Sequence, residues 1–135
     1  MVTVDEVRAV VLPLPRSYEV FVHGRRKFRV GQIVYLAFSR DEATIGFAFP
    51  KEWRAIVVEA EPQKFQLPSA SDMRFNWLHA HLSALDGEEM HDLLMDAWRM
   101  VVPKRVAAEW EARTALALRR LPQRGPSTPR RRPAG

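Results

Sequence analysis

The stretch Ile33-Val34-Tyr35-Leu36-Ala37-Phe38-Ser39, followed by Thr44-Ile45-Gly46-Phe47-Ala48-Phe49, has the composition and alternation of two β-strands. Both runs are rich in β-branched and aromatic residues, which favour extended backbone. Only Arg40–Ala43 connects them. So short a connection joins antiparallel strands, because parallel strands need a crossover of about a dozen residues or more. The pair therefore predicts the centre of an antiparallel sheet.

The alternation along these strands, and along a third run at Arg74–Leu82, predicts which side chains point to each face of the sheet. Successive side chains of a strand point to opposite faces. The larger apolar set should face the core: Val34, Leu36, Phe38, Ile45, Phe47, Phe49, Leu78, Ala80 and Leu82. The other set is smaller, more polar or aromatic and should form an open face: Tyr35, Ala37, Ser39, Thr44, Gly46, Ala48, Trp77, His79 and His81.

Two shorter strand-like runs precede this pair, at Tyr18–His23 and Lys27–Val30. We expect Gly24-Arg25-Arg26 between them to be a turn, because glycine tolerates the backbone angles of tight turns. Gln63–Asp72 is expected to be a loop. With Arg74–Leu82, these runs predict about five strands, most of them joined by short connections as in an antiparallel meander.

Four segments have the periodicity of helices. Thr3 and Glu6 have the spacing of a capping box, which predicts a first helix that ends before Pro13. Asp86 and Glu89 give a second capping signal at the start of the most regular amphipathic segment, Asp86–Val102. The other two segments begin at prolines, a residue tolerated in the first turn. Their predicted buried stripes are Trp53, Ile56, Val57 and Ala60 after Pro50, and Val106, Ala107, Trp110, Ala117 and Leu118 after Pro103.

Together these patterns predict an α+β fold, an antiparallel sheet with helices packed on one face. The predicted centre of the core is formed by Leu36, Phe38, Phe47, Leu94, Trp98 and Trp110. The length of 135 residues suits one domain. We place the domain at residues 1–121 and expect a disordered tail at 122–135, where Pro and Arg dominate. Such a composition buries too little apolar surface to offset the entropy of ordering.

The net charge of +5 is divided unevenly along the chain. Residues 1–112 hold 14 Lys+Arg against 16 Asp+Glu, a net charge of −2. The remaining 7 arginines, from Arg113 onward, supply the whole positive excess. A positive patch is the usual mark of nucleic-acid binding, and here the excess lies at the C-terminal end.

Several classes of protein are disfavoured. The chain has no cysteine, which removes disulfides, thiolate zinc sites and cysteine nucleophiles. It has no apolar run near the roughly 20 residues that span a bilayer and no secretory signal pattern at its start, so we expect a cytoplasmic protein. GxSxG and glycine-rich phosphate loops are missing. His79 and His81 share a strand face without an evident third metal ligand. We therefore expect no enzymatic activity, no cofactor and no metal site.

One candidate binding site is the basic hairpin, defined here as Arg25, Arg26, Lys27 and Arg29. Cations clustered at a turn could contact phosphates and give salt-sensitive, non-specific affinity. The alternative is a solvated turn whose charge is balanced by nearby acidic residues.

A second candidate is the predicted open face, with Tyr35, Trp77, His79 and His81. Aromatic side chains on a sheet can stack unpaired bases. The alternative is that this face is covered by the last helix or by a partner subunit.

Several stretches resemble the MmcQ/YjbR family of small bacterial proteins. They are Lys27-Phe28-Arg29-Val30, Ile33–Phe38, Phe75-Asn76-Trp77, Leu85-Asp86, Asp96-Ala97-Trp98-Arg99 and Val102-Pro103-Lys104-Arg105. The resemblance implies a fold similar to frataxin and CyaY, and a "double-wing" DNA-binding motif. The wings would be the hairpins around Gly24 and Asp41. The second departs from the pattern, because Asp41-Glu42 would face phosphate with like charge.

Two functions follow as hypotheses. The first is a non-enzymatic DNA-binding module, with the basic hairpin placing the domain on DNA and the arginine-rich tail adding non-specific affinity. The second is an adaptor domain whose open face binds a protein or a small ligand without binding DNA. The hairpin cluster favours the first, and the net charge of −2 over residues 1–112 favours the second.

Overall fold

The computed structural model describes residues 1–120, so the predicted tail at 122–135 lies outside the described residues. Within 1–120 the chain forms one six-stranded antiparallel sheet with strand order β1-β2-β3-β4-β6-β5. The strands are β1 (Ser17–Val22), β2 (Arg25–Val30), β3 (Ile33–Phe38), β4 (Thr44–Ala48), β5 (Phe65–Gln66) and β6 (Trp77–His81). The helices are α1 (Val4–Val11), α2 (Lys51–Ala60), α3 (Gly87–Arg99) and α4 (Lys104–Arg119), with two short 3₁₀ turns at Ala70–Asp72 and Leu82–Ala84.

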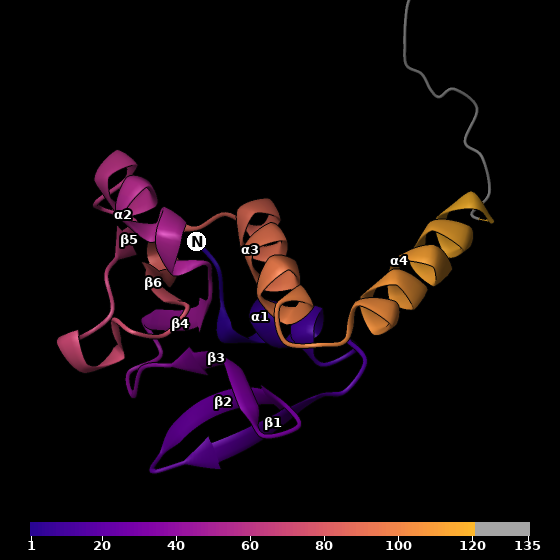
Figure 1. The fold of residues 1–135 in the computed structure, drawn as a ribbon, viewed down its shortest axis with the longest axis horizontal. Helices are drawn as coiled ribbons and strands as arrows, with labels where there is room; N and C mark the ends of the chain where they lie inside the picture. Colours follow the sequence, from indigo (N-terminus) through magenta and orange to yellow (C-terminus); the bar gives the residue numbers. More distant parts are fainter. Residues whose placement is uncertain (121–135) are drawn as a thin grey trace, which may run out of the picture.

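The helices lie on one side of the sheet, as predicted, and the fold is α+β (Figure 1). α3 lies over β3 and β4 with α1 next to it, and α2 lies at the end of the sheet formed by β5 and β6. α4 leads away from this body after the turn at residues 100–103. No helix within residues 1–120 is long and apolar enough to cross a membrane.

Local signals in the sequence explain where the elements begin. The capping box at Thr3 is present, with the Glu6 amide donating to the Thr3 hydroxyl at 3.2 Å. Asp86 caps α3 by accepting from the Glu89 amide at 2.7 Å. His23 and Gly24 both have positive φ, 52° and 78°, as a two-residue hairpin turn requires. The β1–β2 turn is therefore shorter than predicted, and Arg25 and Arg26 belong to strand β2.

The predicted core is confirmed except at one residue. Leu36, Phe38, Phe47, Leu94 and Trp98 are all fully buried. Trp110 is only half-buried and packs edge-on against Trp98, with ring centroids 6.4 Å apart. The strand predicted at Arg74–Leu82 is shorter, Trp77–His81, and the predicted loop Gln63–Asp72 contains the extra short strand β5.

The prediction that Tyr35 faces the open side is wrong. Phe28 pairs with Leu36 and Arg29 pairs with Val34, so strand β3 carries one residue more than β2 at this point. Such a β-bulge shifts the alternation by one. Tyr35 is consequently fully buried, with its hydroxyl 2.5 Å from the Ser17 hydroxyl, and burial raises the pKa of Tyr35 to about 12.

Of the buried stripe predicted for α2, only Val57 packs against the core, and the prediction is wrong for Trp53, Ile56 and Ala60. Trp53 and Ile56 are 59% and 61% exposed, whereas Arg54 is buried. The Arg54 guanidinium donates to the carbonyls of Met73, Phe75 and Trp77, at 2.7 Å for Phe75 and 3.2 Å for Trp77. The buried side of α2 therefore holds Arg54, which binds two carbonyls of the loop before β6 and that of Trp77 in β6, while Trp53 faces outward.

The last helix packs only through its first two turns. Val106 and Ala107 are buried, but every residue from Glu111 to Arg119 is exposed. The prediction that Ala117 and Leu118 are buried is therefore wrong.

Candidate functional site

A groove lies on the face of the sheet opposite α1 and α3. It has a volume of about 760 Å³, and its walls include Arg25 and Lys27 of β2 and Trp77 and His79 of β6. Arg25 and Lys27 point to this side because they alternate with Arg26 and the fully buried Phe28. The structure therefore brings two members of the basic hairpin together with two members of the predicted open face. We call this feature the open-face groove.

The middle of the sheet is made of small residues, which leaves room for the groove. Ala37 and Ala48 line it, and Gly46 lies beside Trp77. A Cβ atom at position 46 would come within 2.8 and 2.9 Å of the indole carbons Cε2 and Cζ2 of Trp77. Glycine is therefore needed at this position for the Trp77 ring to lie across β4.

One wall of the groove is the loop between β5 and β6. Phe75 in this loop is 49% exposed, and the Arg74 guanidinium lies 4.6 Å from its ring centroid. Arg54 anchors this loop by donating a hydrogen bond to the Phe75 carbonyl. The Asn76 side chain accepts a second hydrogen bond from the Lys51 amide at 3.0 Å. The exposed aromatic ring is therefore presented by a loop with fixed anchors.

His79 lies half-buried in the groove between charges of opposite sign. Burial lowers the pKa of His79 from its usual value near 6.5, with Asp72 opposing this effect and Arg25 adding to it. The imidazole is therefore mostly neutral at pH 7. It adds an aromatic surface and a hydrogen-bonding group to the groove, while the positive charge comes from Arg25 and Lys27.

The basic hairpin does not act as one cluster. Arg26 points to the helix-covered side, where its Nη1 lies 2.6 Å from Glu19 Oε2 and its Nε lies 2.8 Å from Glu42 Oε2. Arg8 of α1 also pairs with Glu19, at 3.0 Å. For Arg26, then, the alternative interpretation holds, because its charge is balanced by acidic residues.

The remaining candidates, Arg29 and His81, are not among the residues that line the groove. Arg29 pairs across β1 with Tyr18, and its Nε is buried without a hydrogen-bond partner among residues 1–120. His81 pairs with Thr44 at the end of β6, outside the residues that line the groove. Within the described part of the chain, no group of three His, Asp or Glu residues could hold a metal ion.

Several lining residues were not predicted. Val34 reaches the groove because of the bulge at Tyr35, and Phe75 reaches it from a loop whose position periodicity cannot predict. Ile33 and Met100 are also exposed at the groove, 53% and 41%. Ile33, Val34 and Phe75 had a signal in the sequence, because they belong to the stretches Ile33–Phe38 and Phe75-Asn76-Trp77 that carry the family resemblance.

Residues 12–100 match the family model described as YjbR. The chain belongs to the YjbR family. The matched segment contains every strand of this YjbR domain and almost all of the groove, and it ends before α4. The resemblance seen in the sequence is thereby confirmed.

Among solved structures, the Deinococcus radiodurans protein DR2400, described as a DUF419 domain, is similar with a TM-score of 0.66. The two chains are 22% identical, and the match covers 79% of this YjbR chain and 86% of DR2400. At this identity the likeness shows a shared fold. No curated protein matches the chain.

Proposed function

We propose that this YjbR domain binds nucleic acid without acting as an enzyme, and that it takes a single strand in the open-face groove. One observation carries the proposal: cations of β2 and aromatic rings of β6 and its preceding loop line the same groove. A strand of unpaired nucleotides offers both of the chemical groups that such a groove recognises. Its phosphates match Arg25 and Lys27, and its bases match Trp77 and Phe75.

The aromatic side chains and the cations of the groove should contribute to the binding free energy in different ways. A base stacked on an aromatic side chain contributes about 1–3 kcal/mol with little dependence on sequence. Each phosphate contact releases counterions and adds about 0.7 to the salt slope for single strands. With Arg25, Lys27 and Arg29 on the open face, the domain alone should show a slope of about 2, which is modest. The arginines of residues 122–132 would add further non-specific affinity.

The duplex-binding role implied by two basic wings has weaker support. The first wing lacks the charge of Arg26, which Glu19 and Glu42 neutralise. The second wing is acidic, because hydrogen bonds from the Ala43 amide and the Ser39 hydroxyl lower the pKa of Asp41. An ionised carboxylate at the hairpin tip repels phosphate, so the pair of wings is poorly suited to grip a duplex backbone.

The test is an anisotropy titration of the full chain with labelled oligothymidylate and with a duplex of equal length. Phe75→Ala should weaken single-strand binding about five- to 150-fold, which corresponds to 1–3 kcal/mol. Lys27→Ala should lower the salt slope by about 0.7. The matched control is Lys104→Ala, since Lys104 is exposed at the start of α4 and is not among the residues that line the groove. It should change neither quantity.

A variant of the arginine-rich tail distinguishes the tail's contribution to affinity from that of the groove. With Arg130, Arg131 and Arg132 changed to serine, single-strand affinity should fall but remain sensitive to Phe75→Ala. The proposal is wrong if the duplex binds more tightly than the single strand and Phe75→Ala has no effect. It is also wrong if this tail variant binds no nucleic acid at low salt.

A second candidate function is an adaptor that binds an apolar ligand or peptide in the same groove. The observation in its favour is the exposed apolar rim of Ile33, Phe75 and Met100, between 41% and 53% exposed. Binding of this kind would depend on Phe75 and would be nearly independent of salt and of Lys27. The titration above therefore discriminates the two functions, because an adaptor of this kind should not bind oligothymidylate, whereas the proposed nucleic-acid-binding domain should bind it with a salt dependence that Lys27→Ala reduces.

A further inference from the structure

One acidic side chain lies in the open-face groove among the cations and the aromatic rings. Asp72 lines the groove together with Arg25, Phe75 and Trp77. It ends the 3₁₀ turn Ala70–Asp72, and its backbone carbonyl accepts from the Phe75 amide at 3.0 Å. A carboxylate repels the phosphates of a nucleic acid, so it does not serve to hold the backbone of the strand. The groove therefore contains a group whose presence phosphate binding does not explain.

The Asp72 carboxylate keeps most of its hydrogen-bonding capacity free. Its Oδ2 accepts from the Ser69 hydroxyl at 3.2 Å, and its Oδ1 has no hydrogen-bond partner among residues 1–120. An ionised carboxylate has about four lone-pair sites and no donor. Within the same part of the chain, Asp72 forms no ion pair. These free acceptors are available to a ligand in the groove.

The charges of Asp72 and Arg25 both reach the same point of the groove. Burial lowers the pKa of His79, Asp72 opposes this effect, and Arg25 adds to it. Charges act on a neighbouring group in this way only over short distances. A base that lies over His79 is therefore within reach of a carboxylate and of a guanidinium at the same time.

The four bases differ in what they offer to this pair of charged groups. Guanine has two adjacent donors, N1–H and the N2 amino group, which one carboxylate can accept side by side. It also has two acceptors, O6 and N7, which arginine binds with two hydrogen bonds. Cytosine and adenine each place one amino group beside a ring nitrogen that repels a carboxylate, and thymine places one N–H between two carbonyls. Guanine is therefore the base that matches both charges.

We propose that the open-face groove selects guanine in the single strand that it binds, and that Asp72 determines this specificity. The inference rests on the proposed function, because it requires an unpaired base to enter the groove. In the complex, N1–H and the N2 amino group of guanine donate to the Asp72 carboxylate. Arg25 donates from its Nη groups to O6 and N7, while its Nε donates to the Phe38 carbonyl at 3.0 Å and holds the guanidinium in place.

The other groups of the groove do not distinguish the bases. Contacts of Lys27 with phosphate carry no sequence information, and stacking on Trp77 or Phe75 is tolerant of sequence. A neutral His79 offers one donor and one acceptor, a combination that every base can satisfy. In a duplex, N1 and N2 of guanine are already paired with cytosine. The selection therefore depends on Asp72 and applies to unpaired guanine.

The test is an anisotropy titration of the full chain with three labelled oligothymidylates. One is unmodified, one has a single central guanine, and one has a single central hypoxanthine. The guanine strand should bind about tenfold more tightly than the unmodified strand, within the range of a bidentate contact to a base. Hypoxanthine lacks the N2 amino group, so its strand should lose most of this preference. Phosphate contacts are common to the three strands, so the ratio of their affinities reports on the groove.

Asp72→Asn tests the residue itself. Asparagine keeps one oxygen that can accept from the Ser69 hydroxyl, but it lacks the second acceptor and the negative charge. Affinity for the guanine strand should fall about tenfold. Affinity for the unmodified strand should rise slightly, because a charge that repels phosphate is removed.

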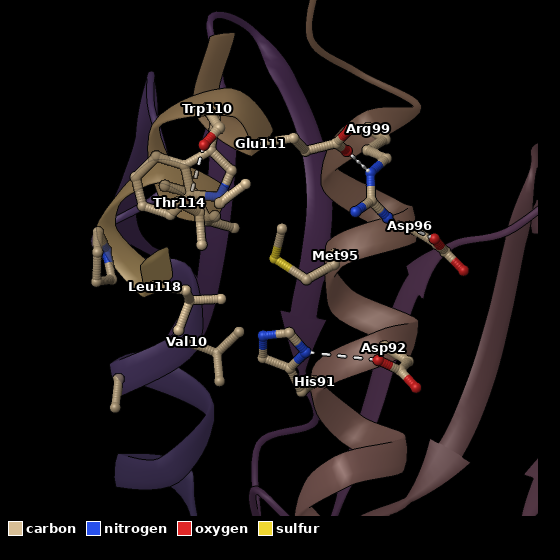
Figure 2. Close-up of a pocket in the computed structure, with 14 residues that line it drawn as sticks. Val10, His91, Asp92, Met95, Asp96, Arg99, Trp110, Glu111, Thr114 and Leu118 are labelled. Carbon is tan, nitrogen blue, oxygen red and sulfur yellow. Dashed lines mark hydrogen bonds and ion pairs between the residues drawn. The ribbon is translucent and has the colours of Figure 1, made fainter. Parts of the chain in front are cut away.

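The matched control is Asp92→Asn. Asp92 lies on α3 and lines a different pocket, between α1, α3 and α4 (Figure 2). Its side chain is 75% exposed, and its carboxylate lies 3.5 Å from the His91 imidazole. The change of charge is the same as at Asp72, and both affinities should stay as they are in the unaltered chain.

The possible results distinguish this selectivity from single-strand binding itself. If the guanine and unmodified strands bind equally well, or if Asp72→Asn keeps the preference, the groove does not select guanine, although single-strand binding stands. A hypoxanthine strand that binds as tightly as the guanine strand also overturns the proposal, because the N2 amino group then makes no contact. If none of the strands binds, the proposed function is wrong and the selectivity falls with it.

Discussion

The two faces of the sheet are built from the same strands and carry different kinds of side chain. On the helix-covered face Phe47 is fully buried, and its cross-strand partner Leu36 is equally inaccessible. On the open face, the neighbouring positions in β4 are Gly46 and Ala48, and the groove there is flanked by half-buried polar and aromatic residues. The period of two along each strand thus separates residues that stabilise the fold from residues available to a ligand. Substitutions on the two faces should accordingly affect different measurements.

The largest effect is expected on the covered face. Leu94→Ala removes a fully buried side chain from α3, and such changes cost about 2–5 kcal/mol of unfolding free energy. Urea denaturation measures the loss, and oligothymidylate affinity of the folded variant should not change. Leu12→Ala is the control, since Leu12 is 39% exposed. A cost below about 0.5 kcal/mol for Leu94→Ala, the usual range of surface changes, would contradict this assignment of the covered face.

The next effect concerns Arg54, which links the covered side to the groove. Arg54→Met keeps most of the side-chain volume and removes the donors to three carbonyls at Met73, Phe75 and Trp77. We expect a loss of about 1.5–3 kcal/mol, as for hydrogen bonds from a charged group. Amide hydrogen exchange should also accelerate in residues 69–76, which form the groove wall. Arg105→Met, at an exposed site on α4, is the control. Unchanged exchange in that loop would show that Arg54 does not anchor it.

Much of the fold could be predicted from the sequence because its strongest signals are local. Capping at Thr3 and Asp86, and alternation in Thr44–Phe49, depend on neighbours a few residues apart. The errors occur where a distant contact decides the outcome. The bulge at Tyr35 depends on pairing with β2, and the rotation of α2 depends on carbonyls some twenty residues beyond Arg54. Helical periodicity identifies an apolar stripe but does not show whether anything covers it, which is why Leu118 was misplaced.

The candidate site was predicted in part. Arg25, Lys27, Trp77 and His79 do lie on one groove, as alternation alone indicates once the strand boundaries are known. Arg26 differs because its partners, Glu19 and Glu42, come from two other segments of the chain. Composition shows how many charges a hairpin holds, and only tertiary structure shows which of them are neutralised.

A smaller effect is expected from a methyl group on the open face. Gly46→Ala places a Cβ atom against the Trp77 indole and must displace the ring. Single-strand affinity should fall about tenfold, at the lower end of the contribution of a stacked base. Gly87→Ala is the matched control, because a Cβ atom there meets nothing within 4 Å, and alanine in a helix is slightly stabilising. If both variants bind equally well, Trp77 does not form part of the binding surface.

The smallest effect is a dependence on pH that comes from His79. Its pKa is lowered in the folded protein, first by burial and further by Arg25, against the opposing effect of Asp72. The unfolded chain therefore takes up a proton at a higher pH than the folded one. The contribution of His79 to stability is complete above the unfolded pKa near 6.5. It falls as the pH drops from there through the lowered folded pKa.

Binding should show the opposite trend, because a protonated His79 adds positive charge beside Arg25. Oligothymidylate affinity should rise a few-fold between pH 7.5 and roughly pH 5.5, and His79→Gln should remove that part of the rise. His91→Gln is the control, since His91 lies on α3, on the other side of the molecule. If the two variants show the same pH profile for binding, the ligand does not approach His79, and the open face would not be the side that receives the strand.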